Sequence, residues 1–237
     1  MTPHLDTVRT TLPAAVLWDL DGTIVDTEPV WLAAELSLAA QHGATWTEQD
    51  GLDLVGSDLL EAGRKIRRRM GLSITAEEVV EALVGAVSEH MRHGDLVWRP
   101  GAREMIAALA EAGVPQALVT MSYDVIAQAM IARMGPNPFD AVVTGDVVSN
   151  GKPHPEPYLT AAATLGVDPR RCVAIEDSNT GTRSAAAAGC QVLVVPNLVP
   201  VDPGERRTQA ETLAGLGPDD LGRLLPPEGA EAEGVDA

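Results

Sequence analysis

The sequence predicts an α/β fold in which a doubly wound, Rossmann-like parallel sheet carries an inserted helical domain. Three observations lead to this prediction. Short apolar runs that do not alternate with polar residues recur along the chain, as is typical of strands buried on both faces of a parallel sheet. Helical stretches lie between most of these runs. One much longer stretch, without a predicted strand, follows the first run.

The predicted strands and helices alternate along the chain. Five strands are predicted over 14–18, 116–119, 141–143, 172–175 and 191–195. Helices are predicted over 102–112, 123–134, 158–165 and 182–188, each followed directly by a glycine. A glycine just past a helix supplies the left-handed cap that ends it. Repetition of strand and helix in this order predicts a doubly wound sheet with right-handed crossovers.

The long gap between the first two strands predicts a separate helical domain. It spans 19–115, far more chain than one crossover helix needs. Helices are predicted within it over 29–41, 58–70 and 76–92, and Pro29 suits a first helical turn. The expected division of the chain is a core domain of 1–27 and 98–225, a helical domain of 28–97 and a disordered acidic tail of 226–237.

Composition narrows the class of partner. The chain has 17 Lys and Arg against 34 Asp and Glu, a formal net charge of −17. Phosphate backbones and anionic lipids repel so acidic a chain, which argues against nucleic acid and membrane partners. No long apolar run or signal-peptide pattern is present, and the two cysteines lack metal or redox spacing. We therefore expect a cytoplasmic protein, and nothing in the sequence demands more than a monomer.

Polar residues follow the predicted strands at the edge where an open parallel sheet binds ligands. The residues expected there are Asp19, Asp21, Thr120, Ser122, Lys152, Glu176 and Asp177. Crowded carboxylates repel each other, and a hard cation such as Mg²⁺ relieves the repulsion. Lys152 and Thr120 would contact an anion beside the metal. Asp19 could attack phosphorus, and a carboxylate two residues on could move the proton.

Each of these features has a simpler interpretation. An Asp-x-Asp pair is commonly a turn or a helix cap, and Glu176–Asp177–Ser178 suits a helix N-cap. Thr120 could end its strand, and Lys152 could be a solvated loop residue. Their joint placement at strand ends favours a single site.

Four segments resemble the motifs of the haloacid dehalogenase superfamily. They are DLDGTIVDTE at 19–28, Thr120, GKPHPEPY at 151–158 and IEDSNTG at 175–181, in family order. The insertion resembles the helical cap of the subgroup that contains β-phosphoglucomutase and small sugar phosphatases. The resemblance covers 14–197 and implies the core-plus-cap fold of that superfamily.

The resemblance also implies roles for individual residues. Asp19 would be the nucleophile and a metal ligand. Asp21 would be the general acid/base, with its backbone carbonyl on the metal. Asp177 would complete the Mg²⁺ site, with Glu176 as a second acid nearby.

The phosphate would be bound by Thr120 and Lys152, with Gly22 and Thr23 forming a turn that brings backbone N–H groups to it. Two more residues are expected at the substrate. Ser122 follows the second strand, and Glu28 lies at the junction of core and cap, where it would touch either the substrate or only the hinge. Trp31, close by, is expected to be a packing residue.

The predicted function is that of a Mg²⁺-dependent phosphatase. Dehalogenases of the superfamily lack the acid/base that Asp21 supplies, whereas phosphatases and phosphomutases have it. Mutases of this subgroup carry a cap Arg after a Gly-containing loop and a cap Lys about twelve residues before Pro-Gly. Here 55–60 contains no Arg, and Ser88 stands twelve residues before Pro100.

We therefore expect hydrolysis of small phosphomonoesters, sugar or polyol phosphates, through an aspartyl-phosphate. A β-phosphoglucomutase-like phosphomutase is the alternative. A receiver-type signalling domain is disfavoured, because the Asp-x-Asp pair follows the first strand and a cap is inserted after it.

Overall fold

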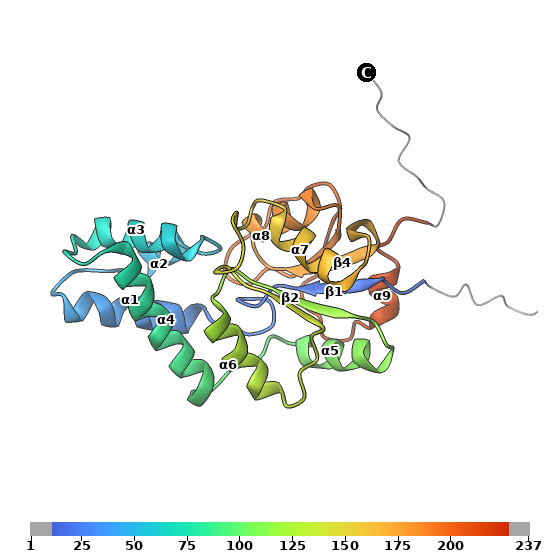
Figure 1. Ribbon diagram of the computed structural model, residues 1–237, viewed down its shortest axis with the longest axis horizontal. Helices are drawn as coiled ribbons and strands as arrows, with labels where there is room; N and C mark the ends of the chain where they lie inside the picture. The colour runs from blue at the N-terminus through green and yellow to red at the C-terminus, as the bar shows by residue number, and fades with distance from the viewer. Residues whose placement is uncertain (1–10, 228–237) are drawn as a thin grey trace, which may run out of the picture.

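The computed structural model describes residues 11–227, which form a six-stranded sheet with helices on both faces (Figure 1). All strands are parallel, in the order β3-β2-β1-β4-β5-β6. Their bounds are β1 Ala15–Trp18, β2 Gln116–Val119, β3 Ala141–Val143, β4 Cys172–Glu176, β5 Gln191–Val194 and β6 Arg207–Gln209. The chain extends the sheet to one side of β1 and then returns to the other, which places a crevice for ligands beside β1.

The predicted doubly wound fold is confirmed, and one strand was missed. β6 pairs with β5 at the sheet edge, and its three residues, Arg207–Gln209, are all polar and only partly covered. A search for apolar runs cannot find such a strand, because an edge strand needs backbone pairing more than a buried face.

Helices cover both faces of the sheet because successive strand side chains point to opposite sides. Val16 and Trp18 of β1 pack with one cluster, whereas Ala15 and Leu17 pack with the other. The first face carries α5 Ala102–Glu111, α6 Asp124–Met134 and α9 Pro218–Gly222. The second carries α7 Glu156–Leu165 and α8 Asn179–Ala187, and a short 3₁₀ turn, η1 Pro169–Arg171, precedes β4.

Two of these helices begin earlier than the apolar pattern predicts. α7 begins at Glu156, with Pro157 in its first turn, and α8 begins at Asn179. The hydroxyl of Ser178 accepts a hydrogen bond from the Gly181 amide and so caps α8. The start of α8 is fixed by this cap and that of α7 by prolines, which suit a first helical turn, so hydrophobic periodicity alone placed the two starts too late.

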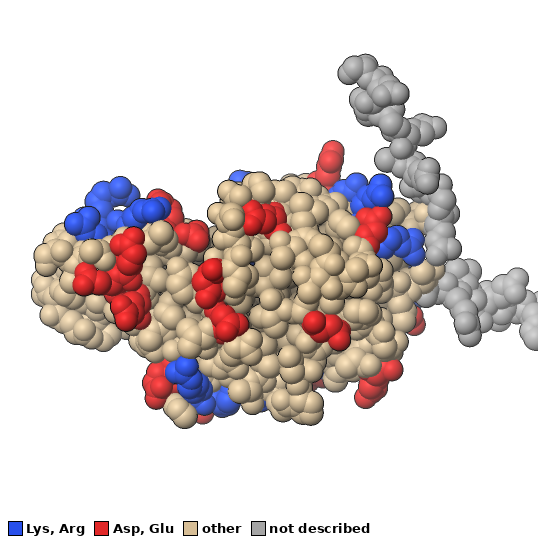
Figure 2. Space-filling model, viewed as in Figure 1, with Lys and Arg blue, Asp and Glu red and all other residues tan. Residues whose placement is uncertain are grey.

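The inserted segment folds as four helices at one end of the molecule, on the left of Figure 1. They are α1 Glu28–Gln41, α2 Glu48–Leu52, α3 Leu59–Met70 and α4 Ala76–His93. α2 was not predicted, since it has only five residues and is fixed by a capping box between Thr47 and Asp50. The basic run 64–69 lies on α3, and blue side chains mark the outer edge of this end in Figure 2.

The two segments that join the helices to the sheet run side by side. Val25 and Trp98 form an antiparallel bridge, the Asp26 amide donates to the Val97 carbonyl at 2.8 Å, and the Arg99 amide donates to the Ile24 carbonyl at 2.9 Å. The chain therefore leaves and re-enters the sheet region through one narrow connection.

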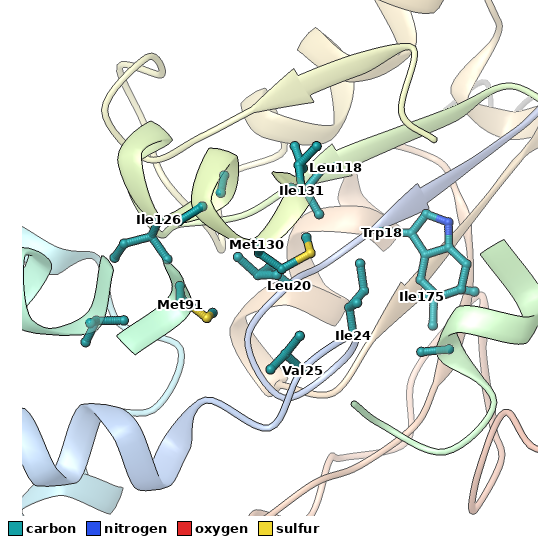
Figure 3. Close-up of a cluster of buried hydrophobic side chains, with 14 of the residues drawn as sticks. Trp18, Leu20, Ile24, Val25, Met91, Leu118, Ile126, Met130, Ile131 and Ile175 are labelled. Atoms are coloured by element: carbon teal, nitrogen blue, oxygen red, sulfur yellow. The ribbon is translucent and has the colours of Figure 1, made fainter. Parts of the chain in front are cut away.

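A shared hydrophobic cluster also connects the two parts. Figure 3 shows Met91 of α4 beside Ile126 and Met130 of α6, close to Leu20. Arg133, also on α6, donates from Nη1 to three backbone carbonyls around the end of α4, each at 3.1 Å. The C-terminal end of α4 is thus fixed to the core.

Two further observations concern the sequence predictions. Within residues 11–227, no helix has the length and apolar character needed to cross a membrane. Of the tail predicted to be disordered, 226–237, all but the first two residues lie outside the described part of the chain.

Candidate active site

A buried ammonium group joins the ends of three strands. Asp19 follows β1 directly, Glu176 is the last residue of β4, and Lys152 lies in the loop after β3. The Lys152 Nζ donates to Asp19 Oδ1 at 2.7 Å, to Glu176 Oε1 at 2.7 Å and to the Val119 carbonyl at 2.8 Å. The three predicted residues therefore meet at the carboxyl edge of the sheet.

Glu176 is held on both of its oxygens. Oε1 also accepts from the Tyr158 hydroxyl at 2.7 Å, and Oε2 accepts from the Ser178 hydroxyl at 3.1 Å and the Asp177 amide at 3.2 Å. Sequence reasoning assigned no role to Tyr158, although it ends the segment 151–158 that carries Lys152. The saturated Glu176 carboxylate serves to fix the lysine beside Asp19.

Asp177 completes a cluster of buried carboxylates. Asp19, Glu176 and Asp177 each offer an oxygen, and these atoms lie within 4.8 Å of one another. Within residues 11–227, no hydrogen bond reaches Asp19 Oδ2 or the Asp177 carboxylate. Clustered carboxylate oxygens, some of which accept no hydrogen bond, are suitable ligands for a hard cation such as Mg²⁺. Gly22 makes room, since a Cβ there would lie 2.0 Å from Asp177 Oδ2.

Burial and crowding shift the acidity of these groups. Burial, and then the negative charge of Glu176, raise the pKa of Asp19 to about 7 despite the nearby Lys152. Burial raises the pKa of Asp177 well above its usual range, and Asp19 and Glu176 add to the effect. Burial lowers the pKa of Lys152, but Asp19 and Glu176 outweigh this and raise it overall. Three carboxylates thus share one cation, and a divalent ion would balance the charge.

Asp21 is held by four side-chain donors. Its Oδ2 accepts from Ser122 at 2.7 Å and from Thr120 at 3.2 Å, both just beyond β2. Its Oδ1 accepts from the Thr27 hydroxyl at 2.7 Å and from the Trp31 indole at 3.0 Å. Thr27 and Trp31 are four residues apart, one helical turn, so they share a face. The expectation that Trp31 only packs is wrong, because its N–H bonds the carboxylate.

These residues face a pocket between the sheet and the four helices. Asp19, Asp21, Ser122, Lys152 and Asp177 line its sheet side. Its other side is lined by residues of the inserted segment, among them Glu28, Trp31 and Glu35. Glu28 and Ser122 therefore lie where substrate residues were expected. Glu35 was not identified from the sequence, where it reads as one polar residue in an apolar helix.

The structure does not bring every predicted residue into this pocket. The amides of Gly22 and Thr23 donate within their own loop, to the carbonyls of Val25 at 2.8 Å and Leu20 at 3.3 Å. Thr23 lines a separate cavity with Arg99. Thr120 is fully buried and reaches the site through its hydrogen bond to Asp21.

Sequence comparison places this chain within a known group of enzymes. Residues 16–195 match the sequence model of a family described as haloacid dehalogenase-like hydrolase. Hexitol phosphatase B of Escherichia coli K12 is 33% identical over 186 residues, which cover 77% of this chain and 83% of that protein. The phosphorylated carbohydrates phosphatase of Thermotoga maritima is 30% identical over 222 residues, 89% and 97% of the two chains.

Solved structures show the same architecture. CbbY from Rhodobacter sphaeroides, crystallised with phosphate, superposes with a TM-score of 0.76 at 27% identity and covers 87% of this chain and 97% of that one. β-Phosphoglucomutase from Clostridium difficile gives a TM-score of 0.66 at 25% identity, with 78% and 86% covered.

Proposed function

This chain belongs to the haloacid dehalogenase-like hydrolase family, and we propose that it is a Mg²⁺-dependent phosphatase acting on small sugar or polyol phosphates. The observation that carries the proposal is the buried ammonium of Lys152, bonded to Asp19 at the floor of a pocket that also holds Asp21 and Asp177. The relatives named as hexitol phosphatase and phosphorylated carbohydrates phosphatase support this substrate class.

Asp19 is the nucleophile of the proposed reaction. One of its carboxylate oxygens attacks the phosphorus, the bond to the leaving oxygen breaks, and Asp21 gives that oxygen a proton. Water then attacks the phosphorus of the aspartyl-phosphate, and Asp21 accepts a proton from that water. Inorganic phosphate leaves, and the Asp19 carboxylate is regenerated. Both half-reactions balance with water as the only co-reactant.

Lys152 positions the nucleophile and offsets charge at the phosphoryl group. Its bond to Asp19 Oδ1 leaves Oδ2 without a hydrogen bond from the described residues. Asp19 and Asp177 would hold Mg²⁺, with Glu176 behind them and the Asp21 backbone carbonyl as a further ligand. When bound, the ion would offset negative charge on the transferring phosphoryl oxygens. Thr120, Gly22 and Thr23 would complete the phosphate site, and for Gly22 and Thr23 this requires the loop amides to change partners.

The helical segment 28–97 is proposed to act as a cap on a core formed by 1–27 and 98–225. Thr27, the residue just before α1, and Trp31, in the first turn of α1, hold one oxygen of Asp21. A change in the position of α1 relative to the sheet would therefore release that oxygen toward the leaving group. Closure of the cap over substrate would couple binding to proton transfer.

The proposed setting is a cytoplasm, with a small phosphomonoester as the partner of a monomeric enzyme. Both cysteines, Cys172 and Cys190, are free and buried, which suits a reducing compartment. The acidic side chains spread over the face shown in Figure 2 do not favour nucleic acid or anionic membranes.

Release of inorganic phosphate from a panel of sugar and polyol phosphates tests the proposal. We expect turnover with Mg²⁺, none after chelation with EDTA, and a loss of at least about a thousandfold in Asp19→Asn, in which a neutral amide replaces the nucleophilic carboxylate. Product isomers are followed by NMR in the same samples. Isomerised sugar phosphate with little free phosphate would instead establish the phosphomutase alternative, and equal activity of Asp19→Asn and wild type would exclude the mechanism.

A further inference from the structure

The half of the pocket formed by the helical segment is acidic. Glu28 and Glu35 line it together with aliphatic side chains such as Leu54, Ile66 and Leu83. Among the described lining residues, the one cation is Lys152, which belongs to the sheet side and already bonds two carboxylates. A leaving group that extends away from the phosphate would therefore meet two carboxyl groups and hydrocarbon, and no positive charge.

Glu35 is fixed in place as an acceptor. Its side chain is only 5% exposed, and its Oε2 accepts from the Trp46 indole at 2.8 Å. Gly51 packs on the same oxygen, since a Cβ there would lie 2.9 Å from Oε2. Within residues 11–227 no hydrogen bond reaches Oε1, and the side chain lines the pocket. One oxygen is thus anchored, and the other is left for a donor from the ligand.

Two buried carboxyl groups without a nearby cation lower the stability of the folded protein. Burial raises the pKa of Glu35 to about 7, and burial together with Asp21 and Glu35 raises that of Glu28 to about 7. A buried carboxyl without a cation destabilises a fold relative to a hydrocarbon side chain of similar size. Groups of this kind in a cleft commonly serve binding or catalysis.

We propose that Glu35 is a specificity residue whose Oε1 accepts a hydrogen bond from a hydroxyl group on the leaving alcohol. The inference rests on the proposed phosphatase function and assigns its leaving-group subsite. Glu28, which lines the same pocket, serves a second hydroxyl. The acidic subsite also disfavours leaving groups that carry a carboxylate or a second phosphate, because no cation is present to neutralise them.

A polyhydroxylated leaving group fits better than an ammonium. Carboxyl groups that are partly protonated near neutral pH both donate and accept, as hydroxyls do, whereas an ammonium only donates. The aliphatic side chains of the subsite can pack against the C–H groups of an open-chain or ring polyol.

The test compares four phosphomonoesters at pH 7 with Mg²⁺. They are a hexitol 6-phosphate, p-nitrophenyl phosphate, 2-phosphoglycolate and aminoethyl phosphate. We expect the wild-type kcat/KM to be highest for the hexitol phosphate. In Glu35→Leu, the ratio of kcat/KM for hexitol phosphate to that for p-nitrophenyl phosphate should fall about tenfold to a hundredfold, the usual cost of a lost hydrogen bond to a substrate hydroxyl.

Two further variants separate binding from folding. Glu35→Gln keeps an acceptor for the hydroxyl, so its ratio should fall less than that of Glu35→Leu. Trp46→Phe removes the N–H that anchors Glu35, together with part of a buried ring, and should raise the KM for the hexitol phosphate more than it changes kcat. Glu89→Gln, an exposed cap carboxylate in α4, is the matched control and should leave the ratio unchanged. Thermal melts verify that each variant is folded.

The outcomes are distinguishable. If the wild type hydrolyses p-nitrophenyl phosphate and hexitol phosphate but the ratio is unchanged in Glu35→Leu and Trp46→Phe, the inference about Glu35 fails while the phosphatase stands. Preference for aminoethyl phosphate or 2-phosphoglycolate over the hexitol phosphate would also overturn it. If the wild type releases phosphate from none of the four, both proposals fail.

Discussion

The ammonium of Lys152 lies between two buried carboxylates, and this contact organises the candidate site. Asp19 comes from one strand end and Glu176 from the neighbouring one, so without the lysine two negative charges would face each other in a dry interior. A buried ion pair of this kind adds little net stability, but removing one partner strongly lowers the free energy of unfolding, because the other charge stays buried and unpaired.

Lys152→Met should therefore destabilise the fold and abolish activity. We expect the free energy of unfolding to fall by about 3 kcal/mol, because two carboxylates lose their cation. Urea denaturation and phosphate release measure the two effects. Lys65→Met, which changes the chain's other lysine on α3, is the control. The assignment would be wrong if both variants retained wild-type stability and turnover.

Glu35 should make stability depend on pH in a defined direction. Its pKa rises from 4.5 to about 7 on folding, so the folded state holds a proton that the unfolded chain has released. Stability therefore declines as pH rises from about 4.5 to about 7 and then levels off. Glu35→Gln should be more stable than wild type at pH 8 by about 1–3 kcal/mol, with a smaller difference at pH 4. Denaturation curves at both pH values test this, and a difference independent of pH would contradict it.

The sequence did not reveal the site contacts of three residues, Trp31, Tyr158 and Glu35. The strand-end carboxylates could be identified because their position follows from the strand pattern. An indole N–H that bonds Asp21, or a helix glutamate that faces a pocket, has no signal in local sequence, since the partner lies on another element.

Among the elements, the start of α8 is fitted tightly to the site. Gly181 lies in its first turn, and a Cβ there would lie 1.8 Å from Glu176 Oε1. The missing side chain is what lets the Glu176 carboxylate lie against the helix N-terminus, next to Lys152.

Gly181→Ala should disturb the site although alanine favours helices. We expect a loss of about 1–3 kcal/mol from overpacking and a large drop in phosphate release, because Glu176 must move away from Lys152. Gly85→Ala in α4, where a Cβ meets nothing within 4 Å, should instead stabilise by about 0.5–1 kcal/mol. Urea denaturation of both variants makes the comparison, and equal effects would refute the role given to Gly181.

The joined segments at Val25 and Trp98 are a second element-level feature that the sequence did not reveal. The length of the gap predicted an insertion, but only the structure shows that its two ends are joined by an antiparallel backbone bridge. Such pairing depends on backbone hydrogen bonds, from Asp26 to Val97 and from Arg99 to Ile24, between segments far apart in the sequence, which no local pattern encodes.

For the whole molecule, a bound divalent ion should add stability. The oxygens of Asp19 and Asp177 are brought together only in the folded chain, so Mg²⁺ should bind the native state in preference to the unfolded one. At a free Mg²⁺ concentration of about 100 times Kd, unfolding should cost about 2.7 kcal/mol more. Thermal melts with Mg²⁺ and with EDTA measure the shift, which Asp177→Asn should largely remove. A shift of the same size in Asp177→Asn would place the ion elsewhere.

The sequence by itself determined the class of fold and the sheet edge at which the chemistry would gather. Apolar runs, glycine stops and strand-end carboxylates are local features, and parallel strands necessarily bring their carboxyl ends together. The edge strand β6, the four donors around Asp21 and the acidic pocket half that contains Glu35 were decided only by tertiary structure. Each depends on which surfaces face one another across distant segments, and that relation is set by packing of the whole chain rather than by any stretch of it.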